Sequence, residues 1–92
     1  MQTKLLLVEH TKNGHWHCED EPALVWFDGV REWWLNGKRH RNTGPAIYSL
    51  KGKHMEWWQH GQLHRLDGPA VIDAYGNKYW YVNGDFKRSE LI

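Results

Sequence analysis

Apolar residues recur at every second position in three segments of the chain, and each segment begins at a Pro-Ala pair. These positions are Ala23, Val25 and Phe27; Ala46, Tyr48 and Leu50; and Ala70, Ile72 and Ala74. A period of two is the spacing of side chains on one face of a β-strand. Proline is tolerated at a strand's entrance, where its missing N–H does not interrupt the ladder. The pattern therefore predicts three strands with apolar faces.

An aromatic segment follows each predicted strand after a single glycine. These segments are Glu32-Trp33-Trp34, Glu56-Trp57-Trp58 and Tyr79-Trp80-Tyr81. Aromatic residues favour strands, and Asp28-Gly29, between the first predicted strand and the first aromatic segment, fits a tight hairpin turn with positive φ. The sequence thus predicts β-hairpins, preceded by a further strand over the apolar run Leu5 to Val8.

The glycines and prolines repeat in a constant phase. The first recurring position holds Gly14, Gly37, Gly61 and Gly84, at intervals of 23, 24 and 23 residues. The second holds Pro22, Pro45 and Pro69, and the third holds Gly29, Gly52 and Gly76. With Gly44 and Gly68, which precede two of the prolines, these positions include all nine Gly and all three Pro. The chain is therefore built from one repeated unit.

The repeat predicts an all-β fold: a single elongated, twisted antiparallel meander of roughly seven or eight strands. Each unit should contain a strand, a tight turn, a second strand and a longer loop framed by glycines. We expect one domain over residues 1–92. It comprises an N-terminal cap strand in 1–12, repeats over about 13–35, 36–59 and 60–82, and a partial repeat in 83–92. Such a sheet has two edges, so self-association through them is plausible.

Composition indicates the cellular compartment of the protein and the classes of partner that it is not expected to bind. A formal net charge of +1 gives no strong attraction to nucleic acid or membrane, so neither is an expected partner. The single cysteine, Cys18, cannot form an internal disulfide and suits a reducing compartment. No apolar run approaches the length of a membrane span or a signal peptide. We therefore expect a soluble, cytoplasmic protein.

The consensus W-W-x-N-G-x-x-H-R-x-x-G-P-A is similar to the MORN repeat, in a variant form with His-Arg and Gly-Pro-Ala. The second and third units carry it best, whereas the first has Cys18 in the Arg position and Glu21 in place of Gly. The resemblance implies a row of β-hairpins that binds proteins or lipids without catalysis. Arrays of this variant resemble proteins of bacteria and their viruses, including antitoxins.

A basic row is the first candidate site. The pairs His40-Arg41, His64-Arg65 and Lys87-Arg88 recur at one repeat position, so they should line one side of the array. In one interpretation each pair packs over a Trp and satisfies loop carbonyls, with Asp67 as a nearby counter-charge. In the other, the guanidinium groups point outward and suit phosphate, base or an acidic protein surface.

An aromatic row is the second candidate site. Neighbouring residues of a strand point to opposite faces, so only one member of each aromatic pair can join a single core. The other row is either covered or exposed as an interface. We assign Trp34, Trp58 and Tyr81 to this second row.

Metal binding and catalysis receive less support. His15, His17 and Cys18 are potential metal ligands close together in sequence, and form a weak candidate site. However, His17 occupies the same repeat position as His40 and His64, so the repeat accounts for this histidine without a metal ion. No nucleophile motif or phosphate-binding glycine loop is visible. We expect no metal, no cofactor and no enzymatic activity.

The leading hypothesis is a non-catalytic protein that occupies or sequesters a host or cognate protein through its aromatic and basic surface, as an inhibitor or antitoxin would. One alternative is a sponge for a small anionic ligand such as a nucleotide, with Arg side chains on phosphates and Trp side chains on bases. Another is a structural scaffold that assembles through its sheet edges.

Overall fold

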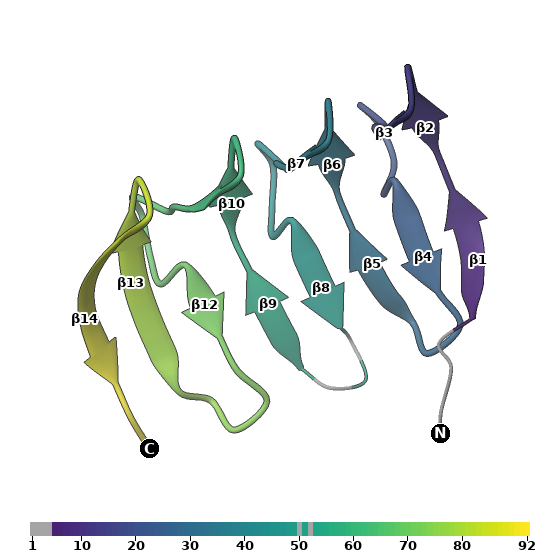
Figure 1. Cartoon of the computed structure of the whole chain (residues 1–92). Coiled ribbons are helices and arrows are strands. Elements are labelled where there is room, and N and C mark those ends of the chain that lie inside the picture. The colour runs from purple at the N-terminus through teal and green to yellow at the C-terminus, as the bar shows by residue number, and fades with distance from the viewer. Residues whose placement is uncertain (1–4, 50, 52) are drawn as a thin grey trace.

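Strands are the only regular elements in the part of the chain that the computed structural model describes, residues 5–49, 51 and 53–92 (Figure 1). Eight of them form one antiparallel sheet, which confirms the predicted all-β meander. In sheet order they are β1 (Leu6–Glu9), β4 (Leu24–Trp26), β5 (Val30–Glu32), β8 (Ile47–Ser49), β9 (His54–Glu56), β12 (Val71–Ile72), β13 (Lys78–Val82) and β14 (Asp85–Glu90).

Three positions or segments discussed above fall outside these residues: residues 1–4 of the expected cap, the strand position Leu50 and the turn position Gly52. The described residues include no helix of the length and hydropathy needed to cross a membrane.

The sheet sets the long dimension of the molecule. Its strands follow the order of the chain, so each repeat adds one antiparallel pair to the sheet. Eight strands about 4.8 Å apart span roughly 34 Å. The measured extents are 36 × 29 × 23 Å. Successive repeats therefore lie side by side, and equivalent residues form rows across the strands.

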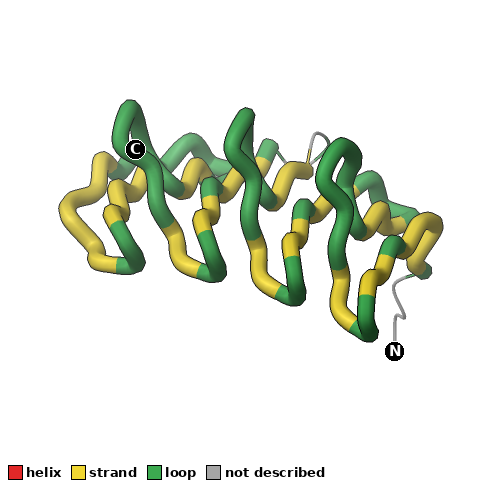
Figure 2. Tube along the Cα trace, turned by 90° about the horizontal axis from the view of Figure 1, so that it is seen from above, coloured by secondary structure: helices red, strands yellow, loops and turns green. Residues whose placement is uncertain are grey.

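The predicted glycine-framed loops contain a second set of hairpins. Strands β2 (Thr11–Lys12) and β3 (His15–Trp16), β6 (Trp34–Leu35) and β7 (Lys38–Arg39), and β10 (Trp58–Gln59) and β11 (Gln62–Leu63) form three two-stranded sheets. Asn36 and Gly37 have φ of 50° and 78°, which is the type I′ turn of a two-residue hairpin. Figure 2 shows these hairpins projecting in a row from the same side of the array.

The predicted tight turn at Asp28-Gly29 lies at the opposite end of the strands. Between β4 and β5 the loop has three residues, and the N–H of Gly29 donates to the carbonyl of Trp26 at 2.9 Å. Only Gly29 of the Asp28-Gly29 pair has positive φ, at 93°. This is a type I turn closed by a left-handed glycine.

Alanine forms the centre of the core. Ala23, Ala46 and Ala70 are each 0% exposed. Their backbones also join neighbouring strands: the N–H of Ala46 donates to Glu56 and its carbonyl accepts from Trp33, both at 2.7 Å. The small side chain thus occupies the point where three strands meet.

The predicted apolar faces are only partly correct. Phe27 is 69% exposed and Ala74 is exposed, because β4 ends at Trp26 and β12 ends at Ile72, before either position. Leu24, which has the opposite parity to Ala23, is 1% exposed and is the largest fully buried side chain among the described residues.

Candidate functional site

The arginines of the basic row each lie flat on the tryptophan that precedes them by eight residues, at the end of the preceding repeat. The distances from guanidinium carbon to ring centroid are 3.7 Å for Arg41 on Trp33, 3.9 Å for Arg65 on Trp57 and 3.8 Å for Arg88 on Trp80. Stacking of a cation on an aromatic face is favourable, more so where water is partly excluded. The same arginine–tryptophan stack thus recurs at three successive boundaries between repeats.

The stacks of Arg41 and Arg65 are also tied to the loops that follow them. Nη1 of Arg41 donates to the carbonyl of Pro45, and Nη1 of Arg65 donates to that of Pro69, both at 3.1 Å. Nε of Arg65 additionally pairs with Asp67 at 3.1 Å. The contacts are those of the inward-packed arrangement, with the loop carbonyls satisfied by guanidinium groups.

The glycines before Pro45 and Pro69 make room for the stacks of Arg41 and Arg65. A Cβ placed on Gly68 would lie 2.8 Å from Cζ of Arg65, and one on Gly44 would lie 3.1 Å from Cζ of Arg41. Any side chain at these positions would push against the guanidinium. The Gly-Pro of the repeat is therefore linked to its Arg by direct packing.

The histidines of the row connect one repeat to the next. Nδ1 of each accepts the backbone N–H of the first residue in the following type I′ turn, at 2.9–3.0 Å. The pairs are His17 with Asn36, His40 with His60, and His64 with Asn83. Lys87 takes the equivalent place in β14, where it is exposed. The histidines therefore act as turn caps between repeats.

His40 is the buried member of this set, with 6% of its surface exposed. Burial lowers its pKa, the positive charge of His60 lowers it further, and a hydrogen bond with Asn42 acts in the opposite direction. The two imidazole rings lie 4.4 Å apart. A neutral His40 is also what the cap requires, since Nδ1 must accept a hydrogen bond.

The second aromatic row is held together by a different arginine. The guanidinium of Arg39 lies 5.2 Å from the ring of Trp34 and 5.1 Å from that of Trp58. Trp34 also meets the edge of Trp16 at 4.9 Å, and Tyr81 meets Phe86 at 5.5 Å. This row is half-buried at Trp34, Trp58 and Tyr81.

Two glutamates that were not among the predicted site residues orient the second row. Glu32 accepts hydrogen bonds from the indoles of Trp26 at 2.6 Å and Trp34 at 3.1 Å. Glu56 accepts from Trp58 at 2.8 Å. The Glu-Trp-Trp triplets indicate this contact in the sequence, because the Glu and the second Trp are residues i and i+2 of a strand and share a face.

The candidate metal ligands His15, His17 and Cys18 are not brought together. Nδ1 of His17 is used as a turn cap, and its Nε2 lies 3.7 Å from Glu19. Among the described residues, the group of side chains close enough to share a metal ion joins Cys18 to His10 and Glu21.

A groove of about 470 Å³ lies between the first and second arginine–tryptophan stacks, and we call it the inter-repeat groove. Its walls include Arg41, Asn42, Trp57, His64, Arg65 and Leu66, with Asp67 also present. The side chain of Leu66 is 80% exposed. The groove thus combines two guanidinium groups with an exposed aliphatic side chain.

The two arginines of the groove differ in their charge partners. Arg65 pairs with Asp67, whereas the equivalent position in the second repeat is Thr43. No carboxylate among residues 5–49, 51 and 53–92 lies within ion-pair distance of Arg41. Burial also lowers the pKa of Arg41. Arg41 is therefore a partly desolvated cation without an anionic partner in the described chain.

Comparisons of the chain with protein-family models, with curated proteins and with solved structures find no significant match.

Proposed function

We propose that this chain is a non-catalytic binding protein that occupies or sequesters a protein partner, and that an acidic segment of the partner enters the inter-repeat groove. The observation that carries the proposal is Arg41, which is partly desolvated and lacks a carboxylate partner among the described residues. The resemblance of the repeat to the MORN motif favours a binding role as well.

An acidic segment matches the chemistry of the groove. A carboxylate can accept two parallel hydrogen bonds from a guanidinium, and such charge-assisted bonds are stronger than neutral ones. Part of the desolvation of Arg41 has already occurred on folding, so the incoming anion meets a cation held in place by Trp33. Leu66 at the rim offers apolar contact beside the charge.

Nucleotide capture is less well supported. A base needs an aromatic face on which to stack. The guanidinium groups of Arg41 and Arg65 already cover one face of Trp33 and Trp57. A base would have to displace an arginine from that face. A protein carboxylate makes no such demand.

Assembly through sheet edges remains an alternative proposal. Strand β1 is an edge of the main sheet, and its apolar side chains, together with Leu5, are exposed. A scaffold built this way would be a stable oligomer, so light scattering at micromolar concentration that finds a clean monomer would exclude it.

A pair of matched variants tests the groove. The immobilised full chain should retain one stoichiometric protein from a lysate of its native host. Leu66→Glu places a negative charge at the groove that repels an acidic segment, so this variant should not retain that protein. Tyr75→Glu alters a residue that is 84% exposed outside the groove, so it should retain the protein.

Equal recovery by Leu66→Glu and Tyr75→Glu would contradict binding in the groove. Failure of the unmodified chain to retain any protein would contradict the proposal as a whole. A thermal-shift screen with nucleotides provides the other arm, because a rise in melting temperature there would favour the anion sponge instead.

A further inference from the structure

The arginine–tryptophan stack is missing at the boundary between the N-terminal cap and the first repeat, and all three positions that form it differ together there. These positions lie four residues before, four after and seven after the hairpin glycine. Around Gly37 they hold Trp33, Arg41 and Gly44, and around Gly14 they hold His10, Cys18 and Glu21. Each replacement belongs to a residue type that ligates metal ions.

The replacements are physically linked. A side chain at Gly44 would meet the guanidinium of Arg41 at 3.1 Å, so a stack and a side chain cannot share this place without a shift. Cys18 is too short to reach across as Arg41 does. The space beside Pro22 is therefore open to the side chain of Glu21.

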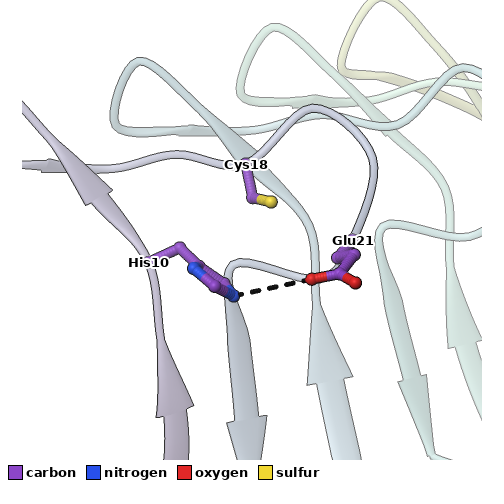
Figure 3. Close-up of side chains that lie close together, drawn as sticks. All are labelled: His10, Cys18 and Glu21. Carbon is purple, nitrogen blue, oxygen red and sulfur yellow. Dashed lines mark ion pairs between the residues drawn. The ribbon is translucent and has the colours of Figure 1, made fainter.

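The three side chains converge in the folded chain (Figure 3). A ring nitrogen of His10, Sγ of Cys18 and a carboxylate oxygen of Glu21 all lie within 4.8 Å of one another. Nε2 of His10 is 3.8 Å from the nearer oxygen of Glu21. They come from the end of β1 and from the loop between β3 and β4.

The backbone holds two of the three positions in place. The N–H of His10 donates to Ala23 at 2.8 Å, and its carbonyl accepts from His17 at 3.1 Å. The N–H of Cys18 donates to Trp34 of the next repeat at 3.0 Å. The side chains of His10 and Glu21 are 42% and 72% exposed, so small rotations can adjust their ligand atoms.

We propose that His10, Cys18 and Glu21 form a binding site for Zn²⁺ or a similar borderline divalent cation. Bond lengths of about 2.0–2.3 Å in a tetrahedral site place ligand atoms roughly 3.3–3.8 Å apart. The observed spacing is within about 1 Å of that range. A thiolate and an imidazole select against Mg²⁺ and Ca²⁺, which prefer oxygen ligands alone.

The site would replace the missing stack. In the second repeat, Arg41 connects Trp33 to the carbonyl of Pro45 and so closes the loop onto the sheet. In the first repeat the metal ion connects β1 to the equivalent loop through Cys18 and Glu21. Three protein ligands leave the fourth position to water or to a donor atom of a partner.

Cobalt provides a direct readout because a thiolate ligand to Co²⁺ gives a charge-transfer absorption band, and Cys18 is the only cysteine of the chain. The metal-free full chain is kept reduced, and circular dichroism verifies that it is folded. It is then titrated with Co²⁺ and afterwards with Zn²⁺. We expect the thiolate band to saturate at one Co²⁺ per chain, and Zn²⁺ to displace it. Absence of the band would overturn the proposal.

Three variants and one control separate this site from weak binding to other histidines. Cys18→Ser should abolish the band, and His10→Gln and Glu21→Gln should each weaken Zn²⁺ binding by more than about tenfold, because loss of an outer-shell partner alone typically costs that much. His15→Gln changes an exposed histidine outside the cluster and should bind as the unmodified chain does. Zn²⁺ binding by Cys18→Ser with unchanged affinity would overturn the assignment.

Discussion

Nδ1 of His40 accepts the backbone N–H of His60 at 3.0 Å, and the two rings lie 4.4 Å apart. One side chain therefore connects the second repeat to the first residue of the next hairpin turn. The contact needs an unprotonated Nδ1. Protonation would both break the cap and place a second positive charge beside His60 whenever that ring is charged.

Acidification should destabilise the fold through His40. Its pKa in the folded chain is lowered, by burial first and by His60 second, from the ordinary value of 6.5 in the unfolded chain. Between these two values the unfolded state binds more protons, so the free energy of unfolding falls as the pH drops through 6.5. Urea denaturation at a series of pH values, from 8 down to the lowest pH at which the chain is still folded, measures the slope of the free energy of unfolding against pH.

Two asparagine substitutions test the assignment. His40→Asn keeps a side-chain acceptor but removes the titration, so its stability should change less with pH than that of the unmodified chain. His60→Asn removes the charge that lowers the pKa of His40, and Asn suits the φ of 50° at this position. It should reduce the slope in part. An undiminished slope in His40→Asn would assign the effect to another group.

Removing a stacked arginine should destabilise the chain. Arg65→Ala loses the contact with Trp57 and leaves the carbonyl of Pro69 without its donor. A partly buried cation–π contact contributes roughly 0.5–2 kcal/mol and a hydrogen bond about 1 kcal/mol, so we expect a loss of about 1–3 kcal/mol in the free energy of unfolding. Urea denaturation monitored by tryptophan fluorescence measures it.

Arg65→Lys keeps the charge but not the planar group, so most of the loss should persist. Arg88, whose side chain is 57% exposed, provides the comparison: Arg88→Ala should cost less than Arg65→Ala. Full rescue by lysine would mean that charge alone, rather than stacking, supplies the stabilisation.

A double-mutant cycle should reveal the link between Gly68 and Arg65. The Cβ of Gly68→Ala would lie 2.8 Å from Cζ of Arg65, so this substitution should displace the guanidinium and cost about 1–2 kcal/mol. In the Arg65→Ala background the same alanine should cost much less, because the clash is gone. Equal costs in both backgrounds would disprove the coupling.

The central alanines should not tolerate larger side chains. Ala46→Leu adds three carbon atoms to a position that is 0% exposed, and overpacking of this kind typically costs about 1–3 kcal/mol. Ala74→Leu makes the same change at an exposed loop position and should have little effect. Thermal unfolding of both variants measures the difference, and similar melting temperatures would contradict the role of Ala46 in the core.

Much of the fold follows from the sequence because glycine, proline and alternating apolar residues each restrict the backbone locally. The positions of Pro45 and Gly29 predict where a strand begins and where a hairpin turns. The small hairpins were missed although Asn36-Gly37 is a strong signal for a two-residue turn. Their strands have only two residues each, too few to show a period.

The candidate site was harder to predict from the sequence, because its contacts depend on how the repeats pack against one another. The sequence places Arg41 and Arg65 in one row but does not determine whether they point outward or onto Trp33 and Trp57. The proximity of Cys18 to His10 and Glu21 arises only when β1 pairs with β4. Alignment of the residues around Gly14 with those around Gly37 does reveal it, since His10 falls in the tryptophan position.

Every junction between repeats uses the same three backbone or capping contacts. At the second junction the N–H of Gly61 donates to Arg39, the N–H of Arg41 donates to Trp58, and Nδ1 of His40 accepts from His60. Equivalent bonds recur at the other two junctions. The protein is therefore extensible: an additional copy of residues 36–59 would carry its own connectors and lengthen the sheet by roughly 9.6 Å.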